Sequence, residues 1–287
     1  MSLTLTAPAK INLSLEVLGK RSDGYHEVRM LMAGLSLADT LAFKPAKDLR
    51  LTCDLDGLDC GEGNLVLRAA RALQKATGCV DGAHISLKKR IPVGGGLAGG
   101  STDAAAALKG LNSLWGCGLT LEALAKLGAT LGSDIPFCLR SGWALATGRG
   151  EKLKPLTLRR KLHFVLLNPG FEVSTKWAYQ SLGRVTSNRR NLSRAAFEAI
   201  QAKDQTALAR AAINDLEPVT AGRFQEIGQL RAGLEQAGAL ISRMSGSGPS
   251  VWGLFEDEAT AKKACQKLKN KVPVALCVST ISALKDK

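Results

Sequence analysis

A glycine-rich stretch at residues 92–103 contains the residue types of this chain that are best suited to chemistry. It reads Pro-Val-Gly-Gly-Gly-Leu-Ala-Gly-Gly-Ser-Thr-Asp, follows a stretch with strand periodicity at residues 83–91, and precedes an alanine-rich run with helical character. Glycine allows backbone N–H groups to approach a ligand closely, and a helix start adds unpaired N–H groups and the positive end of the helix dipole. The order of strand, glycine loop and helix therefore predicts an anion site, most often a phosphate site.

Two common phosphate motifs fit this stretch poorly. A Walker loop requires Lys-Ser or Lys-Thr after the glycines, and neither follows here. Gly94, Gly96 and Gly99 satisfy the dinucleotide pattern G-x-G-x-x-G. The acidic residue expected about 20 positions later, however, has only Glu122 as a candidate, inside an expected helix. The plain alternative to a phosphate site is a flexible glycine hinge.

A lysine and an aspartate elsewhere in the chain are candidates for proton transfer. Lys10 shares one face of an alternating strand with Asn12, and Asp134 stands in an expected loop before Ile135-Pro136. A carboxylate that reaches into a cleft can accept a hydroxyl proton, and an adjacent ammonium keeps that carboxylate ionised. The simpler alternatives are a turn aspartate and a solvated surface lysine.

Composition favours a globular protein with anionic ligands. Hydrophobic residues make up 45% of the chain and charged residues 22%, and the formal net charge is +14. The basic residues are scattered, without an arginine-rich tail or an aromatic-basic motif, so we expect anionic small molecules as partners and no nucleic acid.

No apolar run is long enough to span a bilayer, and the N-terminus lacks the pattern of a signal peptide, so we expect no membrane partner.

The cysteines and histidines give no metal-binding pattern. No two of the seven cysteines are spaced C-x-x-C, and their odd number argues against a disulfide framework. The three histidines are scattered along the chain. We therefore assign no metal ligand, and without an export signal we expect a reducing cytoplasm, or a plastid if a transit peptide were missing.

The elements that position these residues fall into two groups. In the first group we expect strands at residues 3–5 (ended by Pro8), 11–17, 28–37, 49–55 and 143–147. We expect helices after Asn64, after the glycine stretch, and at 121–131, where Thr120 is the expected cap. The basic stretch at residues 153–161, which contains Pro155, marks the expected boundary between domains 1–157 and 158–287.

The second group predicts a ferredoxin-like domain. Its expected elements, in order, are a strand at 162–167, several helices between 174 and 236, strands at 240–244 and 251–255, a helix at 258–268 and a strand at 274–281. This is a β-α-β-β-α-β order when one helix is taken as the first crossover. The fold class is therefore α+β.

Three separated motifs resemble those of the GHMP kinases. In chain order they are Pro8-Ala9-Lys10-Ile11-Asn12-Leu13, the stretch at residues 92–103, and Met244-Ser245-Gly246-Ser247-Gly248-Pro249-Ser250-Val251. Their order and spacing over most of the chain identify it as a member of this family. The resemblance implies a two-domain fold: an N-terminal mixed α/β domain with a glycine-rich phosphate loop, and a C-terminal ferredoxin-like domain. It also implies ATP as the phosphoryl donor, with Mg²⁺ carried on the nucleotide.

Two shorter stretches narrow the resemblance. Asp23-Gly24-Tyr25-His26 and Leu131-Gly132-Ser133-Asp134-Ile135-Pro136-Phe137 are similar to GHMP kinases that act on a cytidine-diphosphate-linked methylerythritol. Such kinases phosphorylate its 2-hydroxyl in the non-mevalonate route to isoprenoid precursors. A GHMP kinase for homoserine or mevalonate is the alternative, and a basic binding protein with the N-terminal fold is a third.

The resemblance implies catalytic and ATP-binding roles for particular residues. Lys10 and Asp134 are the catalytic pair. Ser101 adds a hydroxyl at the phosphates, although it could also be the N-cap of the helix. The ATP-binding set comprises the phosphate loop and two residues near the adenine and ribose: Pro92, Val93, Gly94, Gly95, Gly96, Leu97, Ala98, Gly99, Gly100, Ser101, Thr102, Asn64 and Lys89. An N-cap and a surface lysine are the alternatives for the last two.

The same resemblance implies an acceptor site. Asn12 would bind the acceptor hydroxyl or a phosphate, and His26 would bind the polar edge of cytosine. Tyr25 and Tyr179 would stack on the two faces of the base. Trp177 is the rival of Tyr179, although two residues apart on a helix they face different ways, and packing within the helix is the plain alternative for Tyr179.

Overall fold

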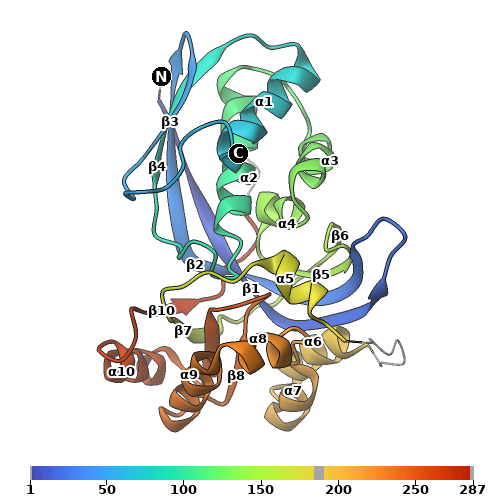
Figure 1. Ribbon diagram of the computed structural model, residues 1–287, viewed down its shortest axis with the longest axis vertical. Coiled ribbons are helices and arrows are strands. Elements are labelled where there is room, and N and C mark those ends of the chain that lie inside the picture. The colour runs from blue at the N-terminus through green and yellow to red at the C-terminus, as the bar shows by residue number, and fades with distance from the viewer. Residues whose placement is uncertain (1, 184–190, 285–287) are drawn as a thin grey trace.

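The computed structural model describes residues 2–183 and 191–284 and contains two sheets, one in the upper and one in the lower half of Figure 1. The first sheet has the order β3-β4-β2-β5-β6, with β1 paired to β2. Its strands are β1 (Leu3–Lys20), β2 (His26–Ala46), β3 (Leu49–Cys53), β4 (Gly82–Lys88), β5 (Trp143–Gly148) and β6 (Lys152–Leu156). The helices of this half are α1 (Leu65–Thr77), α2 (Gly99–Leu114), α3 (Leu121–Leu131) and α4 (Ile135–Arg140).

The second half has the predicted ferredoxin-like topology. Its sheet has the order β10-β7-β9-β8, and every neighbouring pair is antiparallel. The strands are β7 (His163–Asn168), β8 (Ile241–Met244), β9 (Val251–Phe255) and β10 (Val274–Ser279). The helices are α5 (Thr175–Gln180), α6 (Leu192–Ala202), α7 (Gln205–Ala211), α8 (Glu217–Arg223), α9 (Gln225–Gln236) and α10 (Glu258–Leu268). Within the helical stretch expected at 174–236, residues 184–190 lie outside the described residues.

The prediction that Pro8 ends the first strand is wrong. β1 runs without interruption from Leu3 to Lys20 and pairs with β2 along its whole length. The register shifts between Pro8 and Lys10, which accommodates the missing proline N–H at an irregularity of the ladder. The shift leaves the Lys10 N–H free to donate to the carbonyl oxygen of Leu97, at 3.1 Å. β1 is thereby attached to the loop that carries the glycines.

The strict alternation along β1 predicted a half-buried strand, but both of its faces are buried from Ala7 to Val17. The polar face is covered by the second half of the molecule. Glu16 has no exposed surface, and its carboxylate accepts hydrogen bonds from the N–H and hydroxyl of Ser193 on α6, at 3.0 and 2.9 Å. Ser14 and Glu16, two buried polar residues of β1, are therefore held by a partner on α6.

One expected loop and part of the expected domain boundary are regular structure. Residues 135–140 form α4, so Asp134 stands at a helix start and not in a free loop. Part of the basic stretch expected to link the domains is β6, which pairs with β5 at the edge of the first sheet. Proline at position 155 is tolerated there because an edge strand leaves one row of N–H groups unpaired. The two sheets divide between Leu156 and His163, and after β10 the chain returns to the first half, where Ile281 N–H donates to Gly34 O at 3.0 Å.

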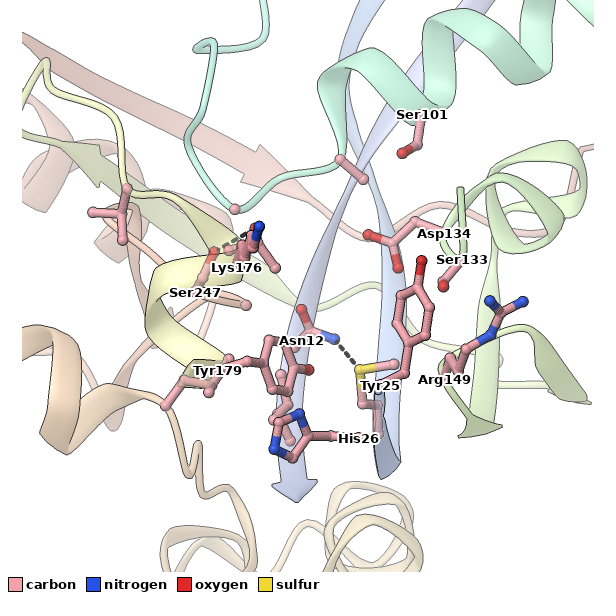
Figure 2. A pocket seen from close by; sticks show the side chains of 18 of the residues that line it. Asn12, Tyr25, His26, Ser101, Ser133, Asp134, Arg149, Lys176, Tyr179 and Ser247 are labelled. Atoms are coloured by element: carbon pink, nitrogen blue, oxygen red, sulfur yellow. Dashed lines mark hydrogen bonds between the residues drawn. The ribbon is translucent and has the colours of Figure 1, made fainter. Parts of the chain in front are cut away.

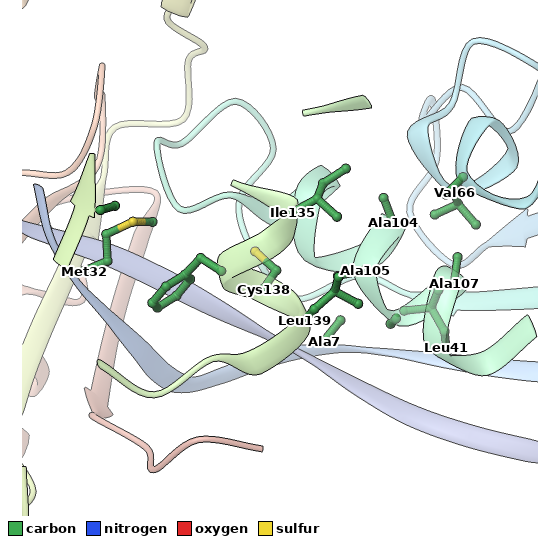
Figure 3. Packing of buried hydrophobic residues seen from close by; sticks show 14 of the residues in the cluster. Ala7, Met32, Leu41, Val66, Ala104, Ala105, Ala107, Ile135, Cys138 and Leu139 are labelled. Atoms are coloured by element: carbon green, nitrogen blue, oxygen red, sulfur yellow. The ribbon is translucent and has the colours of Figure 1, made fainter. Parts of the chain in front are cut away.

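Small residues on α2 let this helix lie close to its neighbours. Ala104, Ala105 and Ala107 are buried, and Figure 3 shows them facing the side chains of α1 and α4. Gly110 has no room for a side chain, since a Cβ there would lie 2.5 Å from the Phe43 ring. Close packing of this kind fixes the direction of α2, and thereby the position of its N-terminus at the functional site.

Candidate active site

A cavity of about 860 Å³ lies where β1, the glycine loop, α4 and α5 meet (Figure 2). Its size is typical of a site for small-molecule ligands. The glycine loop (residues 92–102) lines one side and the turn at residues 23–26 lines another, while the second half contributes α5 and the loop between β8 and β9. Residues of all three sequence motifs therefore face one cavity.

Lys10 and Asp134 meet at this cavity, as predicted. Lys10 Nζ lies 3.5 Å from Asp134 Oδ2, and the two side chains are 5% and 28% exposed. The ammonium is also held by Asn12 Oδ1 at 2.7 Å and by the carbonyl oxygen of Gly96 at 3.3 Å. Buried in this way, Lys10 is fixed beside a carboxylate that still reaches open space.

The glycine loop presents its backbone to the cavity. Gly94 and Gly96 have φ angles of 61° and 73°, which favour glycine. A Cβ on Gly96 would overlap the carbonyl oxygen of Ser245, so this loop and the β8–β9 loop lie in direct backbone contact. The loop residues that line the cavity are Gly94, Gly95, Gly96, Ala98, Gly99, Gly100 and Ser101.

The start of α2 differs in detail from the prediction. The helix begins at Gly99, and Ala98 in the left-handed region takes the N-cap position, so the alternative of Ser101 as the N-cap is wrong. Ser101 instead lines the cavity in the first turn (Figure 2). The N–H groups of that turn have no intrahelical partner, and they lie beside the cavity. The remaining loop residues are not among those that line it: Pro92, Val93, Leu97 and Thr102.

Asn64 and Lys89 are placed outside the cavity lining. Asn64 is the N-cap of α1, where its side chain accepts a hydrogen bond from Val66 N–H at 2.9 Å. The ammonium of Lys89 is buried between Asp39 and Asp103. Asn64 is thus the N-cap named as the alternative, and Lys89 is a buried, paired lysine; their roles near the adenine and ribose stay predictions.

The aromatic residues form an arrangement different from the predicted clamp. His26 and Tyr179 stack on each other, with ring centroids 5.1 Å apart and an interplanar angle of 25°. Tyr25 is 54% exposed, and the Arg149 guanidinium lies 4.8 Å from its ring centroid. One face of Tyr179 is therefore covered by His26, and Figure 2 shows Tyr25 and Tyr179 on separate sides of the cavity.

Tyr179 and Trp177 have different surroundings. Tyr179 lines the cavity, whereas Trp177 packs edge-on against Phe224 with centroids 5.9 Å apart, under the Arg223 guanidinium. Burial raises the pKa of the Tyr179 hydroxyl above its usual value, so it remains a protonated donor. Burial and the charge of Lys20 lower the pKa of His26, which keeps one ring nitrogen as an acceptor at neutral pH.

Several residues that line the cavity were not among the predicted site residues. Lys176 and Thr175 come from the start of α5, and Ser133 and Arg149 come from the first half. The Thr175 and Ser247 hydroxyls lie 3.0 Å apart and connect α5 to the β8–β9 loop. For Thr175, Lys176 and Ser133 the available signal was their proximity to Tyr179 or Asp134 in the sequence, because neighbours of a site residue on a short helix or turn often face the same space. Arg149 had no such signal.

Comparison with known proteins assigns the chain to a family. The GHMP kinases N terminal domain matches residues 64–142, and the GHMP kinases C terminal domain matches residues 196–274. The 4-diphosphocytidyl-2-C-methyl-D-erythritol kinase of Geobacter sp. (strain M21) is 46% identical over 268 residues, which cover 93% of this chain and 94% of that protein. The chain belongs to the GHMP kinase family.

Further GHMP kinases agree with this assignment. A protein with the same name from Gloeobacter violaceus is 45% identical, over 93% of this chain and 90% of that protein. The crystal structure of a 4-(cytidine 5'-diphospho)-2C-methyl-D-erythritol kinase superposes with a TM-score of 0.79 at 35% identity, over 97% of this chain and 99% of that one. The homoserine kinase of Cytophaga hutchinsonii shares the fold, with a TM-score of 0.76 at 21% identity over 98% and 95% of the two chains. Among the described residues, no helix is both long and apolar enough to cross a membrane.

Proposed function

We propose that this GHMP kinase transfers the γ-phosphoryl group of ATP to the 2-hydroxyl of 4-diphosphocytidyl-2-C-methyl-D-erythritol. Its relatives at 45% and 46% identity carry the name of this compound's kinase. The observation that carries the proposal is a single cavity with three neighbouring parts. The Lys10–Asp134 pair lies between the glycine loop and the aromatic group of Tyr25, His26 and Tyr179.

The catalytic pair supplies a base and a positive charge. The Asp134 carboxylate accepts the proton of the acceptor hydroxyl as the oxygen attacks the γ-phosphorus. The bond from that phosphorus to the β–γ bridging oxygen breaks, and ADP leaves with the electron pair. Lys10 places a positive charge 3.5 Å from the Asp134 carboxylate and stabilises the negative charge that spreads over the transferring group. Asn12 fixes the ammonium by accepting its hydrogen bond at 2.7 Å.

The glycine loop and the first turn of α2 bind the phosphates of ATP. Residues of both segments line the cavity, and the helix dipole favours negative charge there. Among the described residues, no three histidine, cysteine or acidic side chains converge as a metal site. The Ser101 hydroxyl and the Asp134 carboxylate do face the cavity, and oxygen donors of this kind suit Mg²⁺ that arrives with ATP and keeps several waters. When bound, Mg²⁺ neutralises phosphate charge.

The acceptor lies on the side of the aromatic group. Cytosine stacks on Tyr25 or on the face of Tyr179 that His26 leaves open. Arg149 and Lys176 also line the cavity and add positive charge beside the aromatic rings. A diphosphate between cytosine and the methylerythritol would be neutralised by such cations.

An acceptor panel tests the proposed function directly. The protein should consume ATP with the cytidylyl conjugate and leave homoserine, mevalonate and free methylerythritol phosphate untouched, because only the conjugate occupies the aromatic group. Product formation is measured by phosphorus NMR and by release of ADP. Faster turnover of homoserine or mevalonate than of the cytidylyl conjugate would overturn the proposal. If free methylerythritol phosphate were used as well as the conjugate, the cavity would have no cytosine site.

A Tyr25→Ala variant should bind the acceptor about 5- to 150-fold more weakly, since a base stacked on an aromatic ring contributes about 1–3 kcal/mol. The Tyr25 side chain is 54% exposed, so its removal costs the fold little. ATP affinity should stay the same, because the glycine loop is a separate part of the cavity. Val80→Ala, at a position that is 90% exposed and outside the lining, is the control. Unchanged acceptor affinity in Tyr25→Ala would exclude stacking on this ring.

A further inference from the structure

Lys89 lies beneath the glycine loop with its ammonium between two carboxylates. Nζ contacts Asp39 of β2 and lies 2.9 Å from Asp103 Oδ2 of α2. The three side chains are almost fully buried, with exposed fractions of 5%, 0% and 3% for Lys89, Asp39 and Asp103. Burial alone lowers the pKa of the ammonium, but the attraction of Asp103 and Asp39 outweighs it and raises the pKa above its usual value. The group is therefore charged and fixed.

Asp39 also holds the chain that leads into the glycine loop. Its Oδ1 accepts hydrogen bonds from the N–H groups of Arg90 and Ile91, the latter at 2.8 Å. The Lys89 N–H donates to Asp54 Oδ1 at 2.7 Å. Because one carboxylate binds both the backbone before the loop and the Lys89 ammonium, the start of the loop is attached to β2.

The same ammonium also contacts the other end of the loop, at Gly99 and Asp103. Asp103 lies in the second turn of α2, and its Oδ1 is buried without a hydrogen-bond partner among the described residues. A Cβ on Gly99 would lie 2.9 Å from Lys89 Nζ, so the ammonium is directly beneath the first residue of α2. Both ends of the loop therefore converge on a single buried charge.

The middle of the loop is held by other groups. The carbonyl oxygen of Gly96 accepts hydrogen bonds from Lys10 Nζ at 3.3 Å and from the Ser245 hydroxyl at 3.0 Å. The carbonyl oxygen of Gly95 accepts one from Ser250 N–H at 3.3 Å. These contacts hold the middle of the loop, but they leave the two ends of the loop dependent on the buried cluster.

We propose that Asp39, Lys89 and Asp103 form a clasp that holds the two ends of the glycine loop together. Lys89 is then a positioning residue, which affects ATP binding through the loop and does not contact ATP. The inference rests on the proposed function only in taking ATP as the ligand of the loop. Without the clasp, the first turn of α2 can move relative to the strand end before the loop. A loop that spends only a fraction of its time in the binding geometry lowers affinity by that fraction.

A double-mutant cycle separates the clasp from a direct contact between Lys89 and ATP. The variants are Lys89→Met, Asp103→Asn and the two together, with the dissociation constant of ATP measured by calorimetry in the absence of acceptor. The clasp predicts that each single change weakens ATP binding by about 10-fold and that the double change weakens it no further. A direct contact predicts the opposite for Asp103→Asn, because freeing the ammonium would preserve or tighten ATP binding. That result overturns the proposal.

Hydrogen exchange of the unliganded protein separates a local change in the loop from a general loss of stability, because a general loss would speed exchange in both sheets. Asp103→Asn leaves the Lys89–Asp39 pair in place, so it stays interpretable if Lys89→Met fails to fold. We expect faster amide exchange confined to residues 89–103, with unchanged exchange in the second sheet. Glu62→Gln, which removes an exposed ion pair with Arg71, is the matched control and should change neither measurement.

The two measurements also separate the clasp from the proposed function. If the unmodified protein binds no ATP, the proposed function fails, while the exchange rates of the loop still decide the clasp. If the unmodified protein binds ATP and loop exchange in Asp103→Asn is unchanged, the clasp is refuted.

Discussion

An Asp134→Asn variant should have a kcat lowered by about 100-fold or more, the usual scale for the loss of a positioned base. Asparagine keeps the shape of aspartate but cannot take the hydroxyl proton. KM for ATP and for the acceptor should change little, because the N–H groups and aromatic rings that bind them remain. The measurement is steady-state kinetics with the cytidylyl conjugate.

The fold should tolerate this change. The Asp134 side chain makes no capping hydrogen bond to α4, although it stands at the N-cap position, and it is 28% exposed. Its partner Lys10 keeps hydrogen bonds to Asn12 and Gly96. Asp56→Asn, in an exposed loop outside the cavity lining, is the control for the loss of a carboxylate. A normal kcat for Asp134→Asn would reduce Asp134 to a counter-ion of Lys10, and another group would have to be the base.

Local sequence signals predicted the position of the glycine loop, but not the contact between the two proposed catalytic residues. The order of strand, glycines and helix specifies a backbone that can approach phosphate, and the structure places these N–H groups at the cavity. The contact between Lys10 and Asp134 was expected from the resemblance to GHMP kinases, since the two residues are distant in sequence. The second sheet was also predictable, because its strands and crossover helices follow each other in a simple order.

The errors in the fold have one physical cause, which is tertiary packing. Pro8 normally ends a strand, but the long pairing of β1 with β2 absorbs it at a register shift. The polar residues of β1 suggested an exposed face, yet α6 of the other half covers it and supplies Ser193 as a partner for Glu16. Neither the long partner strand nor the covering helix is visible in the local pattern.

The placement of Lys89 and Tyr179 depended on partners that sequence spacing does not reveal. Lys89 is paired with Asp39 and Asp103, which lie 50 and 14 positions away. Tyr179 stacks on His26, which belongs to the other half of the chain. In both cases the group that the residue contacts is set by the fold, and the residue's role in ligand binding stays a prediction.

A Gly100→Val variant should bind ATP about 100-fold more weakly than the unmodified protein. Its side chain would stand where the phosphates meet the first turn of α2. Hydrogen bonds to charged groups contribute about 1.5–3 kcal/mol each, so the loss of two contributes about 3 kcal/mol or more, which is about 100-fold in affinity. The measurement is calorimetric titration with ATP in the absence of acceptor.

Gly100 is the suitable position in this loop because the protein leaves space around it. A Cβ on Gly100 would meet nothing within 4 Å, whereas one on Gly96 would overlap the carbonyl oxygen of Ser245 and strain the contact between the two loops. Valine also has a higher helix propensity than glycine, so α2 should not be weakened.

The control is Gly228→Val, at an exposed position of α9 where a Cβ would likewise meet nothing within 4 Å. Its ATP affinity should equal that of the unmodified protein. If a folded Gly100→Val variant binds ATP as tightly as this control, the phosphates do not lie against the first turn of α2. The glycine loop would then be a contact between the two halves of the molecule, and the nucleotide would have to bind through another part of the cavity.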